Sequence, residues 1–396
     1  MVNFAFMASA TLESRRSAAP ALADWQSVLA EAIRSPAELC RLLGMDPALA
    51  AVADRAAGGF PLLVPRPYLA RIRPGDPADP LLRQVLPQAA ELVPAPGFSP
   101  DPLGEAKTGC GPGLLHVLQK YQGRILMVTT GSCAVHCRYC FRRHFPYQNA
   151  LGKGTVPFSS NENRDSPPCV GVAVALPSPQ SAENSGVAVQ LPPQHSVVSL
   201  YAQWDGALEQ IAADPSLHEV ILSGGDPLTL PDAELAEIIG RLAEVPHLRR
   251  LRIHTRLPVM IPQRITDELL GLLRGNRVSP IMVVQVNHPA EIDPAVARAF
   301  GRLVDAGVPL LNQAVLLRGV NDRADVLAEL CERLVDLRVM PYYLHQLDPV
   351  AGAAHFEVPI ETGRTLIAAL RARLPGYAVP RYVRETRGGT NKEVLA

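Results

Sequence analysis

The chain has 396 residues, of which 47% are apolar and 19% are charged, a composition that suits a large core and excludes a mostly disordered chain. Its 38 basic residues balance its 38 acidic ones, which argues against a chain-wide basic surface for nucleic acid or an anionic membrane. No apolar run approaches the roughly 18 residues that a membrane span needs, and the N-terminus lacks the features of a secretory signal. We therefore expect a cytoplasmic protein that binds neither nucleic acid nor membranes.

The N-terminal quarter divides into three parts. Residues 1–22, rich in Ala and Ser, are expected to form a flexible tail. Helical periodicity then begins at Trp25, with Ser35 and Pro36 as the start signal of a second helix. Residues 60–112 are crowded with proline, which favours short turns over a surface. We treat residues 23–115 as one N-terminal helical and proline-rich region.

From Arg124 onward, short apolar segments alternate with amphipathic ones. The predicted strands lie at 125–130, 219–223, 248–255, 280–286, 308–317 and 339–345, and a helix is expected after each, from about 201, 232, 266, 293, 324 and 360. This alternation predicts an α/β fold with a parallel sheet, built as a partial (β/α)6 TIM-like barrel over residues 116–384. Chemistry in such barrels gathers at the carboxyl ends of the strands. A short strand at 377–383 leads into a C-terminal tail, residues 385–396.

One segment, at about 150–198, interrupts this alternation. It is rich in Ser, Pro, Asn and Gly, and GVAVALP at 171–177 nearly recurs at 186–192 as GVAVQLP. We interpret it as a low-complexity insertion in the barrel region, with a short hairpin at the repeat as the alternative.

Seven cysteines do not describe a disulfide framework in a chain of this size. Three of them, Cys133, Cys137 and Cys140, form a C-x3-C-x2-C run directly after a predicted strand. Three thiolates can hold a [4Fe–4S] cluster with one open iron, which we favour, or a zinc ion with His136 or His144 as fourth ligand. A chance cluster is the third possibility. The other four are expected to be buried or incidental thiols: Cys40, Cys110, Cys169 and Cys331.

The cysteine run and its surroundings, MVTTGSCAVHCRYCFRRHFPY, resemble the radical S-adenosylmethionine lysine 2,3-aminomutase family, and within it the short bacterial branch that acts in β-lysylation of elongation factor P. The resemblance extends from Trp25 to Lys392, through DPLLRQVLP, APGFSPDPL, SGGDPL, RLRIHTRLP, LLNQAVLLRGVND and MPYYLHQLDPVAGAAHF. It implies the barrel type of radical S-adenosylmethionine enzymes and an isomerase that makes (R)-β-lysine from L-lysine.

The same resemblance implies the cofactors and partners. The cofactors are a [4Fe–4S] cluster, S-adenosyl-L-methionine and pyridoxal 5′-phosphate. The partners are an electron donor and, functionally, elongation factor P with its β-lysine ligase. The alternatives are an aminomutase for another amino acid such as glutamate, a radical enzyme that has lost pyridoxal phosphate, and a zinc-bound structural module.

The resemblance also assigns residues to the cluster and to S-adenosylmethionine. The three cysteines match the cluster ligands, and a turn after the second strand matches the motif that contacts the methionine amino group: Ser223, Gly224, Gly225 and Asp226. Glycines let a backbone approach a ligand, and a carboxylate suits an ammonium. The alternative is an ordinary turn in which Asp226 caps the next helix.

Four further residues match positions that bind pyridoxal phosphate in the family. Lys392 matches the lysine that binds this cofactor covalently, although a lysine near a chain end is more often a solvated charge. Lys120, Tyr121 and Arg124 match the positions that hold the cofactor's phosphate and ring. The alternative for these three is a solvated loop that leads into the first strand.

The substrate positions come from the same resemblance. Arg142 matches the residue that pairs with the amino-acid carboxylate, and Asp322 and Asp348 match the pair that receives the side-chain ammonium of lysine. Their alternatives are a helix cap for Asp322 and a turn for Asp348. Three histidines are expected at the same barrel mouth, as packed or hydrogen-bonding residues without an assigned role: His144, His254 and His345.

Overall fold

The computed structural model of the chain describes residues 24–105, 117–147 and 202–396. The predicted tail and the predicted insertion at about 150–198 fall outside these ranges, as do Cys110 and Cys169. Within the described ranges, no helix combines the length and the hydropathy needed to span a bilayer.

In the described part of the chain, nine strands form one sheet in which each strand pairs with the next one in sequence order. Strands β2 to β8 run parallel, and the outermost strands β1 and β9 are antiparallel to their neighbours. Their bounds are β1 Val117–Tyr121, β2 Arg124–Thr130, β3 Glu219–Gly224, β4 Arg250–Thr255, β5 Ser279–Val284, β6 Leu310–Val315, β7 Met340–His345, β8 Arg381–Arg384 and β9 Glu393–Val394. The predicted partial (β/α)6 barrel is confirmed, and β8 adds a seventh parallel strand.

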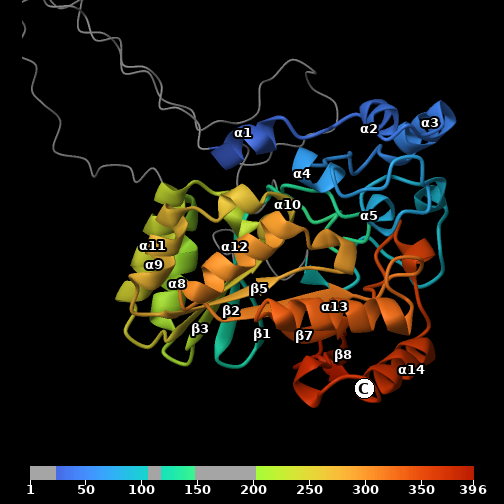
Figure 1. Cartoon of the computed structure of the whole chain (residues 1–396). Helices are drawn as coiled ribbons and strands as arrows, with labels where there is room; N and C mark the ends of the chain where they lie inside the picture. Colours follow the sequence, from blue (N-terminus) through green and yellow to red (C-terminus); the bar gives the residue numbers. More distant parts are fainter. Residues whose placement is uncertain (1–23, 106–116, 148–201) are drawn as a thin grey trace, which may run out of the picture.

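A helix follows each of the first six parallel strands and flanks the sheet (Figure 1). These helices are α8 Asp205–Ala213, α9 Asp232–Glu244, α11 Asp267–Arg274, α12 Pro294–Asp305, α13 Ala324–Asp336 and α14 Ile360–Arg371. Helix α12 shows why they form: Asp293 caps it by accepting from the Val296 amide at 2.8 Å, and Phe300 and Leu303 continue its buried stripe.

Short helices make up the N-terminal region and the loops after the strands. In the N-terminal region they are α1 Asp24–Ala30, α2 Pro36–Leu42, α3 Pro47–Ala56, α4 Arg66–Leu69, α5 Pro80–Arg83 and η1 Ala89–Leu92. In the barrel they are η2 Ala202–Trp204, η3 Pro227–Thr229, α10 Leu257–Met260, η4 Pro262–Arg264, η5 Pro289–Glu291, η6 Ala354–Phe356 and η7 Gly376–Ala378. The helix start predicted at Ser35 is confirmed, since its side chain caps α2.

The N-terminal region, blue in Figure 1, packs against the loops at the carboxyl ends of the strands. Arg71 makes this contact explicit: its guanidinium donates to the carbonyl of Val259, at 2.6 Å, and to that of Glu291. These two carbonyls lie in the loops after β4 and β5. The region therefore covers the end of the barrel at which chemistry is expected.

The two faces of the sheet differ in polarity. In β4, Leu251 and Ile253 join the core formed with the helices, and Arg252 and His254 alternate with them on the other face. In β7, Leu344 packs with the helices, and His345 lies on the opposite face. In these two strands the inner face is thus polar, which suits a polar ligand better than a filled apolar core does.

Candidate active site at the carboxyl ends of the strands

Three thiols share the loop that follows β2. Cys133, Cys137 and Cys140 are partly buried and interact electrostatically with one another. Burial raises the pKa of Cys133 well above its usual value and that of Cys140 to about 11, and neighbouring thiols add to both shifts. A metal centre deprotonates coordinating thiols by its own charge. A cationic centre bound by this loop would therefore oppose the shifts of the pKa of Cys133 and of Cys140.

The histidines that could complete a zinc site contact backbone carbonyls. Nδ1 of His136 lies 2.7 Å from the Pro61 oxygen, and Nε2 of His144 lies 3.1 Å from the Ala351 oxygen. Among the described residues, no three Cys, His, Asp or Glu side chains are grouped so that they could hold one metal ion. A zinc ion gathers its sulfurs at about 2.3 Å from a single centre, whereas a [4Fe–4S] cluster binds each thiolate at a separate iron.

A buried carboxylate fixes the cysteine loop to the N-terminal region. Oε2 of Glu91 lies 2.6 Å from Nη2 of Arg138 and 2.8 Å from Nη2 of Arg143, and all three side chains are at most 5% exposed. The amide of Arg138 also donates to the Gln84 carbonyl at 2.9 Å. The helical and proline-rich region thus positions the loop that carries the thiols.

The Gly-Gly-Asp turn after β3 lies directly against the same loop. The Gly225 amide donates to the Thr130 carbonyl at 2.6 Å, and the Asp226 amide donates to the Ser132 carbonyl at 2.7 Å. A Cβ atom on Gly225 would lie 2.2 Å from the Ser132 oxygen, so no side chain fits there. Gly224 has a φ of +118°, a conformation that also favours glycine.

Asp226 is buried and accepts four hydrogen bonds within the protein. Oδ1 receives the Thr255 hydroxyl at 2.7 Å and the Leu228 amide at 3.1 Å, and Oδ2 receives the amides of Arg256 and Leu257 at 2.7 and 3.0 Å. Burial raises the pKa of Asp226, although these hydrogen bonds oppose the shift. The side chain thus caps η3 and ties the turn after β3 to the end of β4.

Arg256, at the end of β4, contacts a thiol. Its Nη1 lies 2.7 Å from Sγ of Cys137, and its Nη2 donates to Glu291 at 2.9 Å and to Gln84 at 2.8 Å. The guanidinium is therefore held from one side by a buried carboxylate and directed at the cysteine loop from the other.

Arg142 lies in the cysteine loop and is buried. Its Nε donates to Oε2 of Glu105 at 2.8 Å, and its Nη1 donates to the Ser223 hydroxyl at 3.1 Å. Two predicted site residues, one from the cysteine loop and one from β3, thus meet here. Burial alone would raise the pKa of Glu105, but the charges of Arg142 and Lys120 outweigh it and hold that pKa below its usual value.

The chain's C-terminal segment returns to the barrel mouth through β9. The Lys392 amine forms an ion pair with Glu385 and lies 5.9 Å from the centre of the Tyr343 ring. It also interacts electrostatically with Asp348 and His345. The side chain of the predicted cofactor lysine is 26% exposed, and residues of the barrel mouth surround it. A solvated charge would not have such neighbours.

The residues predicted to hold the cofactor's phosphate and ring lie next to the same carboxylate. Lys120 is 3.7 Å from Glu385 and 3.0 Å from Glu105, and the Tyr121 hydroxyl donates to Glu385. The Arg124 guanidinium lies 4.5 Å from the centre of the Tyr121 ring. Lys120 and Tyr121 belong to β1. The segment for which a solvated loop was the alternative prediction is therefore an edge strand.

The two predicted carboxylates differ in their surroundings. Burial raises the pKa of Asp348 to about 7, and the charge of Lys392 opposes that shift. Asp322 lies partly buried in the turn between β6 and α13, and within the described part of the chain no hydrogen bond or ion pair joins it to Asp348 or Lys392. Asp348 therefore belongs to the group around Lys392, and Asp322 is not seen to join it.

Sequence reasoning missed Glu105, Glu385 and Arg256. Glu105 and Arg256 act through partners far away in the sequence, as Glu105 and Arg142 do across 37 positions. Glu385 carried a weak signal, because it lies seven residues before Lys392 in the same tail. A carboxylate near a predicted covalent lysine is a reasonable candidate partner.

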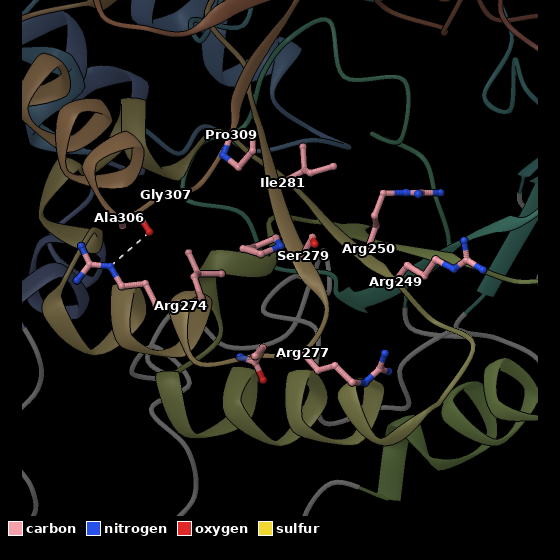
Figure 2. A pocket seen from close by; sticks show the side chains of 12 residues that line it. Arg249, Arg250, Arg274, Arg277, Ser279, Ile281, Ala306, Gly307 and Pro309 are labelled. Atoms are coloured by element: carbon pink, nitrogen blue, oxygen red, sulfur yellow. Dashed lines mark hydrogen bonds between the residues drawn. The ribbon is translucent and has the colours of Figure 1, made fainter.

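A separate cavity lies at the amino ends of β4, β5 and β6 (Figure 2). It has a volume of about 620 Å³, and four arginines line it: Arg249, Arg250, Arg274 and Arg277. Arg277 donates to three carbonyls at the end of α9 and Arg274 donates to the Ala306 carbonyl, so two of the four hold loops together. This end of a barrel serves stability more than chemistry, and we assign the cavity no function.

Comparison with known proteins gives long matches to enzymes of one name. An L-lysine 2,3-aminomutase of Escherichia coli is 42% identical over 377 residues, which cover 95% of each chain, and one of Haemophilus influenzae is 41% identical over 94% of this chain and 96% of that one. One of Clostridium subterminale is 37% identical over 82% of this chain and 66% of that enzyme. No family model matches the chain.

Proposed function

The chain belongs to the L-lysine 2,3-aminomutase family, and on that premise we propose that it converts L-lysine into (R)-β-lysine by moving the amino group from C2 to C3. The observation that supports this most directly is the position of Lys392. Its amine interacts with Glu385, Asp348 and His345, at the same end of the barrel as the three thiols. A covalent cofactor lysine needs this location.

The thiol loop has the chemistry of an iron–sulfur ligand set. We propose that Cys133, Cys137 and Cys140 hold a [4Fe–4S] cluster whose fourth iron is open to S-adenosylmethionine. Two buried guanidinium groups, those of Arg256 and Arg142, adjoin these thiols and would favour their ionised form. S-adenosylmethionine would lie against the neighbouring turn, formed by Ser223, Gly224, Gly225 and Asp226.

The residues around Lys392 fit pyridoxal phosphate. We propose that Lys392 holds the cofactor and that Lys120, Tyr121 and Arg124 hold its phosphate and ring. Two cations and a phenol suit a phosphate dianion. The inner wall also carries two buried imidazole nitrogens, Nε2 of His254 and of His345, without a hydrogen-bond partner among the described residues. A polar ligand would satisfy them.

The protein's part in the reaction is to bind, orient and enclose. When bound, the cluster and S-adenosylmethionine supply a carbon radical, and pyridoxal phosphate supplies a conjugated system that stabilises the migrating nitrogen. Arg142 would bind the substrate carboxylate with a guanidinium that Glu105 and Ser223 already orient. The N-terminal region, packed over the mouth, would keep water from the radical.

Carboxylates in the mouth favour lysine over glutamate. Asp322 and Asp348 are the proposed acceptors of the substrate's side-chain ammonium, and Glu385 offers a third carboxylate beside Lys392. A glutamate side chain would be repelled there. Reconstituted protein should therefore release a β-amino acid from L-lysine and none from L-glutamate, as read by chromatography of the products. Turnover of glutamate in preference to lysine would refute the assignment.

We further propose that the product serves elongation factor P, through a β-lysine ligase, and that an electron donor reduces the cluster in the cytoplasm, where thiols stay reduced. The support comes from the lengths of the matched enzymes. The match to the E. coli enzyme covers 95% of both chains, whereas the match to the C. subterminale enzyme covers only 66% of that enzyme. An assay that offers free lysine and lysine already attached to elongation factor P would separate the two possible substrates.

A further inference from the structure

Two histidines on the inner face of the barrel have buried nitrogens without partners. His254 is the last residue but one of β4, and His345 is the last residue of β7. Within the described residues, Nε2 of each is inaccessible to solvent and makes no hydrogen bond. Buried polar atoms in folded proteins are nearly always paired, so an unpaired one indicates a missing ligand or water.

The two histidines have different neighbours. His254 interacts electrostatically with Arg252, Lys392, Arg142 and His345. His345 interacts electrostatically with Lys392 and Glu385. Burial, reinforced by the cations, lowers the pKa of His254 well below its usual value and that of His345 to about 3. Both rings are therefore neutral at physiological pH, and a neutral ring carries a proton on one nitrogen that it can donate to an anion.

The structure of an amino acid bound at this site indicates which of its groups lies beside His254. The α-carbon of the substrate carries both the nitrogen that joins the cofactor, in place of Lys392, and the carboxylate that Arg142 binds. In the sheet, Ile253 pairs with Leu222, so His254 lies beside Ser223, whose hydroxyl accepts from Nη1 of Arg142 at 3.1 Å. A side chain in that position, which also interacts electrostatically with Lys392, therefore lies near the α-carbon and its carboxylate. We propose that His254 binds the α-carboxylate of the substrate together with Arg142, an inference that rests on the proposed function.

His254 thus has a role that Arg142 alone does not fill. Arg142 already donates hydrogen bonds from its Nε to Glu105 and from its Nη1 to Ser223. Only part of its guanidinium therefore remains to bind the substrate. A neutral imidazole adds a second donor without adding another charge to a site that already contains Arg252 and Lys392. His345 lies on the side of Lys392 and Glu385, and it serves as an internal comparison.

Equilibrium binding without turnover tests this assignment. Protein loaded with cluster and pyridoxal phosphate, without S-adenosylmethionine or reductant, is titrated with L-lysine and with 1,5-diaminopentane, which is lysine without its carboxylate. The change in cofactor absorbance reports both. His254→Ala should weaken lysine binding about tenfold or more, as expected for a lost hydrogen bond to a charged group. Binding of 1,5-diaminopentane should stay unchanged.

Three further variants sharpen the result. His254→Gln, which keeps an N–H donor, should recover part of the lysine affinity and provides a second readout where the alanine variant fails to fold. His345→Ala should not change the ratio of the lysine to the diaminopentane affinity. His355→Ala is a matched control, because both nitrogens of His355 are also buried without partners and its neighbours are Glu91 and three arginines away from Lys392.

The outcomes separate this inference from the function on which it rests. Equal weakening of both ligands in His254→Ala, or no weakening of lysine, would show that His254 only packs in the wall, and would overturn the inference alone. A wild-type protein whose cofactor absorbance does not respond to lysine would overturn the proposed function and the inference with it.

Discussion

Nη1 of Arg256 and Sγ of Cys137 lie 2.7 Å apart, although 119 positions separate the two residues in the sequence. The guanidinium is buried and anchored to Glu291, so it keeps its charge and direction. Hydrogen bonds and positive charge at a ligand sulfur stabilise the reduced form of an iron–sulfur cluster, which carries one more electron. The contact therefore predicts that Arg256 helps to set the cluster's reduction potential.

Replacing this contact should shift the potential. In Arg256→Gln the cluster should be harder to reduce by about 60 mV, which corresponds to ~1.4 kcal/mol for a one-electron couple. Spectroelectrochemical titration of the reconstituted protein measures it. Arg264→Gln is the matched control, because Arg264 is equally buried but bonds Asp232 and two carbonyls. Equal potentials in wild type and Arg256→Gln would contradict the account.

The ion pairs of Glu91 predict a large stability effect at the cysteine loop. Glu91→Gln should lower the free energy of unfolding by about 3–5 kcal/mol, because it leaves the buried guanidinium groups of Arg138 and Arg143 without a counter-charge. Urea unfolding of the metal-free protein measures the loss. Glu38→Gln is the surface control: Glu38 pairs with Arg66, whose side chain is 48% exposed, and such pairs contribute at most about 1 kcal/mol. A similar loss in both variants would argue against the buried network.

Asp348 predicts a pH dependence of stability. Burial raises its pKa to about 7, so the folded chain keeps a proton that the unfolded chain loses above about pH 4. The stability linked to this raised pKa is fully present below about pH 4 and is lost as the pH rises to about 7, by up to ~1.4 kcal/mol per pH unit. The free energy of unfolding of Asp348→Asn should therefore increase relative to that of wild type as the pH rises between these values. Above about pH 7 the difference should stay constant.

Urea unfolding at a series of pH values measures that difference. Asp267→Asn, at a side chain that is 94% exposed, should follow wild type throughout. A constant difference between wild type and Asp348→Asn from pH 4 to 8 would show that burial does not raise the pKa of Asp348.

Lys392 is predicted to carry the cofactor. Lys392→Arg keeps a positive charge beside Glu385 but has no amine that can join an aldehyde, so it should retain iron and lose the cofactor's visible absorbance. Lys392→Ala should do the same. Absorbance and iron analysis of the purified variants provide the two readings. Wild-type cofactor absorbance in either variant would assign the covalent role to another lysine.

The repeating part of the fold could be read from the sequence because each element there is local. EVILS became β3, and the helix predicted from about 324 became α13, because an apolar run or an amphipathic stripe needs no distant partner. Strand β1 escaped notice because Gln119 and Lys120 make it polar, and it is held by its antiparallel pairing with β2. Pairing of that kind depends on tertiary contacts.

The candidate site shows the same division. The cysteine spacing indicated a metal loop without any structure, and the placement of Gly225 against Ser132 gives the physical reason for the glycine. The interior network could not be predicted, since its carboxylates, Glu91, Glu105 and Glu385, find their partners only when the N-terminal region and the tail fold onto the barrel. Likewise, only the fold reveals that Nε2 of His254 is buried without a partner.

The central claim is that this site moves an amino group between adjacent carbons of lysine. The most direct measurement uses L-lysine labelled with ¹⁵N at the α-amino group, incubated without oxygen with the reconstituted protein, S-adenosylmethionine, pyridoxal phosphate and dithionite, and followed by NMR. The account predicts β-lysine with the ¹⁵N bonded to C3. Recovery of lysine with its label still at C2, while iron and pyridoxal phosphate are bound at full occupancy, would contradict it.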